Sequence, residues 1–371
     1  MDNLLIGNGL NIEFANQDIS NKGIILRAID NIKERKINTD ILIDEPDLLL
    51  SFFGRLYRQM DSILNGDYID CVITTDDKIS YKKFLEDYGD KKTIRITDIG
   101  FEDYFFIYHL VRRKYNIDNE NGYIIMKTLE RYFIDSIFNE GKINKIYKDY
   151  PETLKDFFMK FDNIFTTNYD ENISLFTGRT VYYLHGAFHI KADVYDSNSM
   201  RNKLYDAPLK DIEVDEDYYH LYSNCITTYS GNNKLFVIRQ PKWANEAISK
   251  FAEGYKNRPE IKADIDSFKE SDNEIVRKMY ESTVLKLRDE SLSFSDNYPI
   301  EEFENIVGDI TIVGLAPNND IHIFEMINKN PNINKVYYYY YSPTQNNLVK
   351  DMLNNKKVEF KSVNDLWKLY S

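Results

Sequence analysis

Short apolar runs that end in Gly, Asn, Asp or His alternate with longer amphipathic stretches along this chain. The runs are typical of buried strands in a parallel sheet, and the stretches between them are typical of helices. The clearest runs cover residues 4–6, 164–167, 181–184 and 310–313. This alternation predicts an α/β fold, with a Rossmann-like parallel sheet, helices on both of its faces and a helical insertion.

The positions of these runs predict how the chain is divided. We expect a single domain over residues 1–371, with a discontinuous Rossmann-like core. The core would consist of three parts, at about 1–35, 160–190 and 305–371. The intervening stretches, about 40–150 and 190–300, are then helical or irregular insertions.

The spacing of apolar residues and short β-branched or alternating runs predict individual helices and strands. Apolar residues at helical spacing predict helices near 24–32, 48–63, 101–115, 123–138, 151–161, 321–328 and 346–354, two more over 243–288, and a short one at the C-terminus. Short runs rich in β-branched or alternating residues predict further strands at 71–75, 92–97, 235–238, 335–341 and 358–360.

Composition narrows the class of protein. Apolar residues make up 43% of the 371, which is enough to bury a sizeable core. The net charge is −13 and no basic block occurs, so direct binding of nucleic acid is unlikely. The two cysteines, Cys71 and Cys225, cannot form a four-cysteine zinc site. Without a signal peptide or a long apolar run, we expect a cytoplasmic protein that does not enter a membrane.

A glycine turn, Gly7-Asn8-Gly9, follows the first strand-like run. Glycine permits positive φ and lets a phosphate approach the backbone closely. The turn lacks the third glycine of the full dinucleotide fingerprint, and its alternative interpretation is an ordinary tight turn.

The segment Thr166-Thr167-Asn168-Tyr169-Asp170 places an amide and a carboxylate at a strand end. The amide of Asn168 both donates and accepts, so it can orient a ribose hydroxyl, a water or a carboxamide. Asp170 either contacts polar groups in such a site or caps the next helix.

His185 ends the run Val181–Leu184 and is followed by Gly186. A histidine has a reference pKa near 6.5 and can act as a general base. The alternative is a buried histidine bonded to the backbone. Gly186 favours close approach by another group, and hence the functional interpretation.

A second polar loop, Gly314 to Asp320, follows the run at 310–313. It could hold ribose hydroxyls, or it could serve turn formation and helix capping. We expect His322 to pack in the first turn of the next helix or to support a ligand contact. Ser342, at the end of a later strand, is a weaker nucleotide candidate.

Taken together, these segments resemble the sirtuin-like superfamily, in particular the bacterial sirtuin-like NAD-consuming proteins of antiphage defence. The glycine turn also resembles the abortive-infection AbiH family. The chain lacks the zinc-ribbon cysteine pairs of deacetylating sirtuins, and Glu13-Phe14-Ala15-Asn16 stands in place of their Gly-Ile-Pro-Asp-Phe-Arg-like loop. NAD hydrolysis is therefore expected rather than protein deacetylation.

The resemblance implies that NAD is the substrate, that no metal takes part, and that Asn168 and His185 are the catalytic pair. The residues expected to line the dinucleotide are Gly7, Asn8, Gly9, Asn11, Thr167, Asp170, Gly314, Leu315, Asp320 and Ser342. The resemblance also implies a homo-oligomer that stays silent until triggered, with a HerA-type ATPase as a candidate partner. A non-catalytic nucleotide-binding sensor or scaffold and an ADP-ribosyltransferase remain alternatives.

Overall fold

The computed structural model describes residues 1–37, 45–117, 120–205, 207, 209–229 and 231–370. The chain forms two compact units. The first comprises Met1–Ala187, Cys225–Leu235 and Pro299–Ser371, and the second comprises Phe188–Asn224 and Phe236–Tyr298. All three parts of the expected Rossmann-like core, and the stretch of about 40–150, fall in the first unit. Most of the stretch of about 190–300 forms the second.

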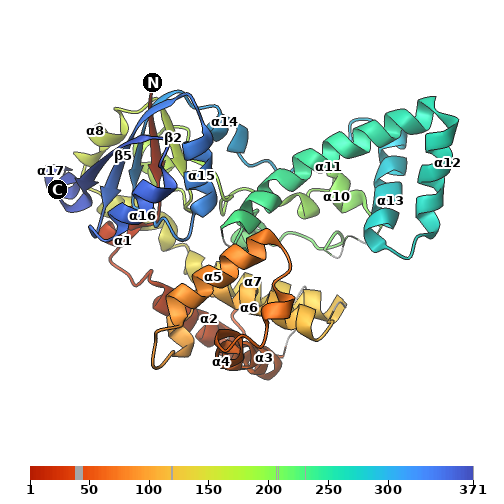
Figure 1. Ribbon diagram of the computed structural model, residues 1–371, viewed down its shortest axis with the longest axis horizontal. Coiled ribbons are helices and arrows are strands. Elements are labelled where there is room, and N and C mark those ends of the chain that lie inside the picture. The colour runs from red at the N-terminus through yellow and green to blue at the C-terminus, as the bar shows by residue number, and fades with distance from the viewer. Residues whose placement is uncertain (38–44, 118–119, 206, 208, 230, 371) are drawn as a thin grey trace. The chain divides into compact units, whose positions relative to one another are not determined.

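One six-stranded parallel sheet organises the first unit (Figure 1). Its strands are β1 (Asp2–Ile6), β2 (Asn163–Thr166), β3 (Tyr182–Tyr183), β4 (Gly308–Val313), β5 (Ile333–Tyr340) and β6 (Lys357–Ser362). They lie in the order β3-β2-β1-β4-β5-β6, and every neighbouring pair is parallel. This is the strand order of the doubly wound Rossmann fold. The predicted α/β fold is thereby confirmed.

Burial explains the apolar residues of the central strands β1 and β4. In a doubly wound sheet, helices cover both faces, so side chains on both faces of a central strand must be apolar. Leu4, Leu5 and Ile6 of β1 are fully buried, as are Ile310 and Ile312 of β4. The two strands pair directly, and together they form the centre of the core.

The register brings the strand ends to one level. Ile6 pairs with Thr166 of β2 on one side and with Val313 of β4 on the other. From β1 the chain continues to β2 and β3 on one side and returns to β4 on the other, so the topological switch point lies between β1 and β4. Ligands of doubly wound proteins bind outside the carboxyl ends of the strands at this point.

Helices make up the rest of the first unit. They are α1 (Gly9–Phe14), α2 (Asn21–Glu34), α3 (Pro46–Arg58), α4 (Met60–Leu64), α5 (Thr75–Tyr88), α6 (Phe101–Lys114), α7 (Glu120–Phe138), α8 (Leu154–Phe158), α9 (Asn172–Thr177), α14 (Ile300–Glu304), α15 (Ile321–Lys329), α16 (Gln345–Met352) and α17 (Val363–Tyr370). Packed rings join several of them: Phe53 of α3 contacts Tyr104 of α6 and Phe133 of α7. The helices expected in these regions are confirmed.

Two strands expected in this unit are wrong. Residues 71–75 contain the end of the 3-10 helix η1 (Ile69–Cys71) and the start of α5. The Thr74 hydroxyl accepts from the N–H of Asp77, whose carboxylate accepts from the Thr74 N–H, and this capping box starts a helix. Residues 92–97 end in the 3-10 helix η2 (Ile96–Asp98), where the Asp98 carboxylate binds Arg95.

The second unit is mainly helical. It contains most of α11 (Asn232–Asn257), with α12 (Pro259–Ser267), α13 (Glu274–Arg288) and the short α10 (Met200–Lys203); 3-10 helices are η4 (Asp193–Tyr195), η5 (Glu216–Tyr222) and η6 (Phe268–Glu270). Figure 1 shows α12 and α13 side by side. The strand expected at 235–238 is wrong, because these residues belong to α11. The stretch 243–288 forms three helices instead of the expected two.

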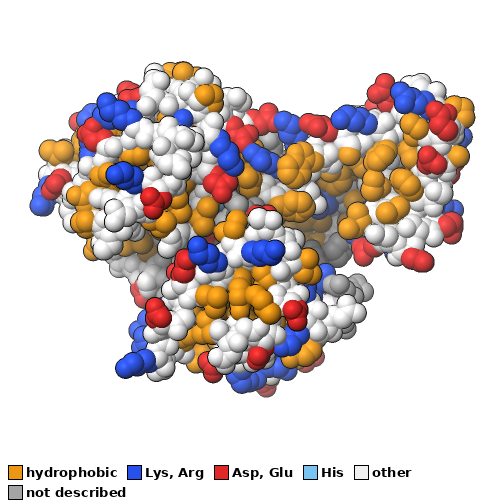
Figure 2. Space-filling view, viewed as in Figure 1, with side chains coloured by type: hydrophobic (Ala, Val, Ile, Leu, Met, Phe, Trp, Pro, Cys, Tyr) orange, Lys and Arg blue, Asp and Glu red, His pale blue; other side chains and the backbone are white. Residues whose placement is uncertain are grey.

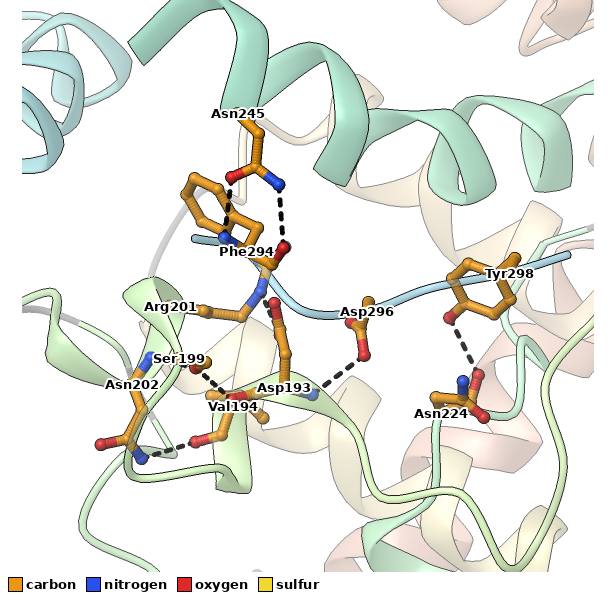
Figure 3. A network of polar contacts seen from close by, with 10 residues as sticks. All are labelled: Asp193, Val194, Ser199, Arg201, Asn202, Asn224, Asn245, Phe294, Asp296 and Tyr298. Atoms are coloured by element: carbon orange, nitrogen blue, oxygen red, sulfur yellow. Dashed lines mark hydrogen bonds and ion pairs between the residues drawn. The ribbon is translucent and has the colours of Figure 1, made fainter. Parts of the chain in front are cut away.

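Polar contacts fix the irregular segments of this second unit (Figure 3). The Arg201 Nε donates to Asp193 Oδ1 at 2.6 Å, and the backbone N–H of Asp193 donates to Asp296 Oδ1 at 2.9 Å. The side chain of Asn245 binds both the N–H and the carbonyl of Phe294. Burial, together with the nearby Asp193 carboxylate, raises the pKa of Asp296 to about 7.

The surface carries mixed charge on the face that Figure 2 shows, where basic and acidic side chains are interspersed. Among the described helices, none combines the length and the apolar character that crossing a membrane requires.

Candidate functional site

The loops that carry the expected site residues leave the sheet at one edge. They follow the carboxyl ends of β1, β2, β3, β4 and β5, at Gly7, Thr167, Leu184, Gly314 and Tyr341. This placement is what the sequence predicts. The side chains on these loops nevertheless separate into groups with different surroundings.

The glycine turns after β1 and β4 pack directly against each other. The N–H of Gly9 donates to the carbonyl of Gly314 at 2.9 Å, and the N–H of Gly7 donates to the carbonyl of Val313 at 2.9 Å. A Cβ on Gly9 would lie 2.5 Å from the Cα of Gly314, and a Cβ on Gly7 would collide with the Gly314 carbonyl. These glycines therefore permit contact between two backbones, and the N–H groups of Gly7 and Gly9 already have acceptors. Asn8, between them, is exposed.

Asn11 and Asp170 lie in a buried polar network. Asn11 Nδ2 donates to Asp170 Oδ2 at 2.6 Å, and Asn11 Oδ1 accepts from the hydroxyl of Tyr150 at 2.7 Å. Asp170 Oδ1 accepts from both the backbone N–H and the side chain of Asn172, the first residue of α9. Burial raises the pKa of Asp170 to about 6, while its hydrogen bonds with Asn172 and Asn11 oppose this rise. The network ties together the segments around α1, α9 and residue 150.

Asn168 follows β2, and its side chain lies next to the end of β1. Its backbone N–H donates to Thr166 Oγ1 at 3.0 Å, and its Nδ2 is 3.5 Å from the carbonyl of Gly7. The side chain is largely buried, whereas the neighbouring Thr167 is half-buried and donates its N–H to the carbonyl of Ile6. The long contact with Gly7 holds the amide only weakly, so Asn168 retains hydrogen-bonding capacity at the edge of the sheet.

Leu315 and Ser342 make local contacts. Leu315 is buried, and its carbonyl accepts from the hydroxyl of Tyr338 at 3.1 Å. The Ser342 hydroxyl lies 2.9 Å from the hydroxyl of Thr344, beside the start of α16. Both positions follow strand ends as expected, and their assignment to a dinucleotide stays a prediction.

His185 meets two residues of the loop and helix that follow β4. Its Nε2 lies 3.0 Å from the Nε2 of His322, and the two rings stack with centroids 5.1 Å apart. The same nitrogen lies 3.9 Å from Asp320 Oδ1. All three side chains are buried. Because β2 and β1 separate β3 from β4 in the sheet, this cluster joins loops from the two sides of the switch point.

Burial controls the charge of this cluster. It lowers the pKa of His185 well below the usual value and lowers that of His322 to about 3, in both cases helped by the ammonium group of Lys234. It raises the pKa of Asp320 to about 7, against the opposing effect of Lys234. Lys234 is itself buried and forms an ion pair with Glu102, at 2.6 Å. Both imidazoles are therefore neutral at neutral pH.

Neutral imidazoles restrict which nitrogen carries a proton. Each ring has one N–H and one lone pair, so the 3.0 Å contact requires a proton on one Nε2 and a lone pair on the other. His322 Nδ1 is buried and has no hydrogen-bond partner. The backbone carbonyl of His185 accepts from the N–H of Ile226, which fixes the loop after β3.

His322 is the member of the cluster that the sequence does not assign to the site. The signal available was its position two residues after Asp320 at the start of a helix, which does not distinguish a packed histidine from a functional one. No protein-family model, curated protein or solved structure matches the chain. The site is accordingly interpreted from its own geometry.

Proposed function

We propose that this protein is an NAD+ glycohydrolase that cleaves NAD+ to nicotinamide and ADP-ribose. The observation that carries the proposal is the Rossmann strand order, with Asn168 and His185 on loops at the carboxyl edge beside the switch point. Nucleotides bind at this edge in doubly wound folds. The resemblance of the same segments to sirtuin-like NAD-consuming proteins of antiphage defence supplies the choice of substrate and the proposed role in NAD depletion.

The proposed reaction breaks the bond between the ribose C1′ and the nicotinamide nitrogen. The transition state resembles an oxocarbenium ion, as in glycoside hydrolysis, and the cationic nicotinamide leaves without a general acid. The oxygen of a water molecule bonds to C1′, and its proton passes to the neutral imidazole of His185. Asn168 orients the water or a ribose hydroxyl through its amide.

The burial of His185 has a consequence for this mechanism. Only 1% of its surface is exposed, so its imidazole cannot reach substrate unless a neighbouring loop moves. The loop around Asp320 and the start of α15 are the segments that the structure shows in contact with the His185 side chain. A resting state with a covered base supports the proposal that the enzyme stays silent until a trigger or partner, such as a HerA-type ATPase, acts on it.

Single-turnover release of nicotinamide tests the proposal. In triggered protein, His185→Ala is expected to slow cleavage by at least about a hundredfold, the usual value of general-base catalysis. Asn168→Ala should also slow cleavage, and His189→Ala, at an exposed position, is the control. Cleavage at the wild-type rate in His185→Ala would remove His185 from the mechanism.

The covered imidazole also favours a second candidate, a nucleotide-binding sensor that does not cleave its ligand. The same experiment separates the candidates by product. Intact NAD+ recovered from the protein indicates a sensor, free ADP-ribose indicates a hydrolase, and label transferred to protein or nucleic acid indicates an ADP-ribosyltransferase.

A further inference from the structure

Three potential metal ligands lie close together on the loop that follows β3 and on the loop and helix that follow β4. His185, Asp320 and His322 each offer one atom, and these atoms all lie within 4.8 Å of one another. In the part of the chain that the structure describes, this is the one group of three such side chains found. All three are buried, whereas fortuitous acidic groupings are common on exposed surfaces.

The distances suit a single bound ion. Zinc lies about 2.0–2.2 Å from nitrogen and oxygen ligands, which places the ligand atoms of a tetrahedral site about 3.3–3.6 Å apart. The two Nε2 atoms are 3.0 Å apart, and Asp320 Oδ1 is 3.9 Å from His185 Nε2. All three ligand atoms already lie within 4.8 Å of one another, so a side-chain adjustment of Asp320 would complete the set.

The charges of the cluster also favour a cation. The Asp320 side chain is buried, and its Oδ1 lies 3.9 Å from the Nε2 of His185. An imidazole ring can turn the lone pair of one nitrogen toward an ion. The ammonium group of Lys234, whose charge acts on the cluster, forms an ion pair with Glu102 at 2.6 Å. A divalent ion would balance Asp320 and replace the contact between two nitrogen atoms.

We propose that His185, Asp320 and His322 bind one divalent transition-metal ion of the zinc class. Imidazole ligands suit zinc, iron, copper and nickel, and a set of three protein ligands leaves a fourth coordination position open. The site goes beyond the proposed hydrolase function and does not depend on it. An ion on His185 Nε2 would occupy the lone pair that a general base uses, so the metal-bound and base-active forms exclude each other.

His322 sets the expected affinity. Histidine ligands usually donate their second N–H to an acceptor, and loss of such a partner weakens metal binding about 10–100-fold. His322 Nδ1 is buried without a partner. We therefore expect weaker binding than at a zinc site in which every histidine ligand has such a partner.

The test is calorimetric titration of the chelator-treated full chain with Zn²⁺, and with Co²⁺ followed by visible absorption. We expect one site per chain and ligand-field bands typical of nitrogen and oxygen ligation. His322→Ala and the nearly isosteric Asp320→Asn should each weaken binding at least tenfold. His109→Ala removes a half-buried histidine of α6 outside the cluster and should leave binding unchanged.

The midpoint of thermal unfolding, measured with and without Zn²⁺, tests the site in variants that are less stable than the wild type. Zn²⁺ should raise the midpoint of unfolding of the wild type and of His109→Ala, and it should raise that of Asp320→Asn by less. Absence of a stoichiometric site, or equal affinity in wild type, His322→Ala and Asp320→Asn, would overturn the proposal. Because no readout uses NAD+, failure here is distinct from failure of the hydrolase proposal.

Discussion

Substitution of Gly314 by alanine tests the packing of the two glycine turns. Gly314 has a φ of 71°, and an L-residue in this left-handed region costs about 1–2 kcal/mol. Its new Cβ would lie 2.9 Å from both the Cα of Gly9 and the backbone nitrogen of Leu10. Since these are backbone atoms that cannot rotate away, overpacking adds about 1–3 kcal/mol. We expect Gly314→Ala to lower the free energy of unfolding by about 2–5 kcal/mol.

Two matched variants separate the cost of the positive φ from the cost of the steric overlap. Gly178 has a φ of 67°, and nothing lies within 4 Å of the Cβ that alanine would place there, so Gly178→Ala reports the backbone cost alone. Gly9→Ala introduces a Cβ 2.5 Å from the Cα of Gly314 without requiring a positive φ, so it reports the steric cost. The predicted order of destabilisation places Gly314→Ala above Gly178→Ala.

The assay is urea unfolding followed by tryptophan fluorescence. The chain has two tryptophans. In a Trp243→Phe background the remaining one, Trp367, packs against Phe14 and reports the first unit. Equal destabilisation by Gly314→Ala and Gly178→Ala would show that the turns do not pack closely, and would refute the reasoning.

Further variants test the buried polar groups and one helix start. Asp170→Ala removes the carboxylate that accepts from the side chains of Asn11 and Asn172 and from the backbone N–H of Asn172, and it should cost about 2–4 kcal/mol. The exposed Asp30→Ala should change stability by less than about 0.5 kcal/mol, and similar values for the two variants would contradict the network. The pKa of Asp296 rises on folding from 3.8 to about 7, so its protonated form is favoured in the folded state and its contribution to stability falls as pH rises through this window. Asp296→Asn should therefore gain stability relative to wild type between pH 5 and 8, as measured by thermal unfolding, and a constant difference would be inconsistent with this. Thr74→Ala removes the capping box of α5 and should cost about 1 kcal/mol in urea unfolding, with no change as the contrary result.

The central strands could be predicted from the sequence because each contains consecutive apolar residues, a pattern typical of a strand that is buried on both faces. Leu4, Leu5 and Ile6 are apolar without alternation, which only a strand covered on both faces requires. A polar or glycine residue directly after such a run then marks the carboxyl edge of the sheet. The pattern therefore gave both the fold and the placement of the candidate loops.

Other features of the fold and of the candidate site depend on residues that lie far away in the sequence. The run at 235–238 is short enough to fit a strand or a helix turn, and its place within the long α11 decides it. The role of His322 depends on His185, 137 positions earlier. The turn at Gly7 and Gly9 was interpreted as room for a phosphate, while both glycines make room for the backbone of Gly314. In each case the structure at one position depends on residues outside the short segment from which it was predicted.

The most direct test of the central proposal is a crystal structure of the protein with ADP-ribose, the expected product. We predict that the ligand lies over the carboxyl ends of β1 and β2, with a ribose hydroxyl within hydrogen-bonding distance of the Asn168 amide and the His185 imidazole uncovered toward C1′. ADP-ribose bound elsewhere, or no binding at millimolar concentration, would contradict the account.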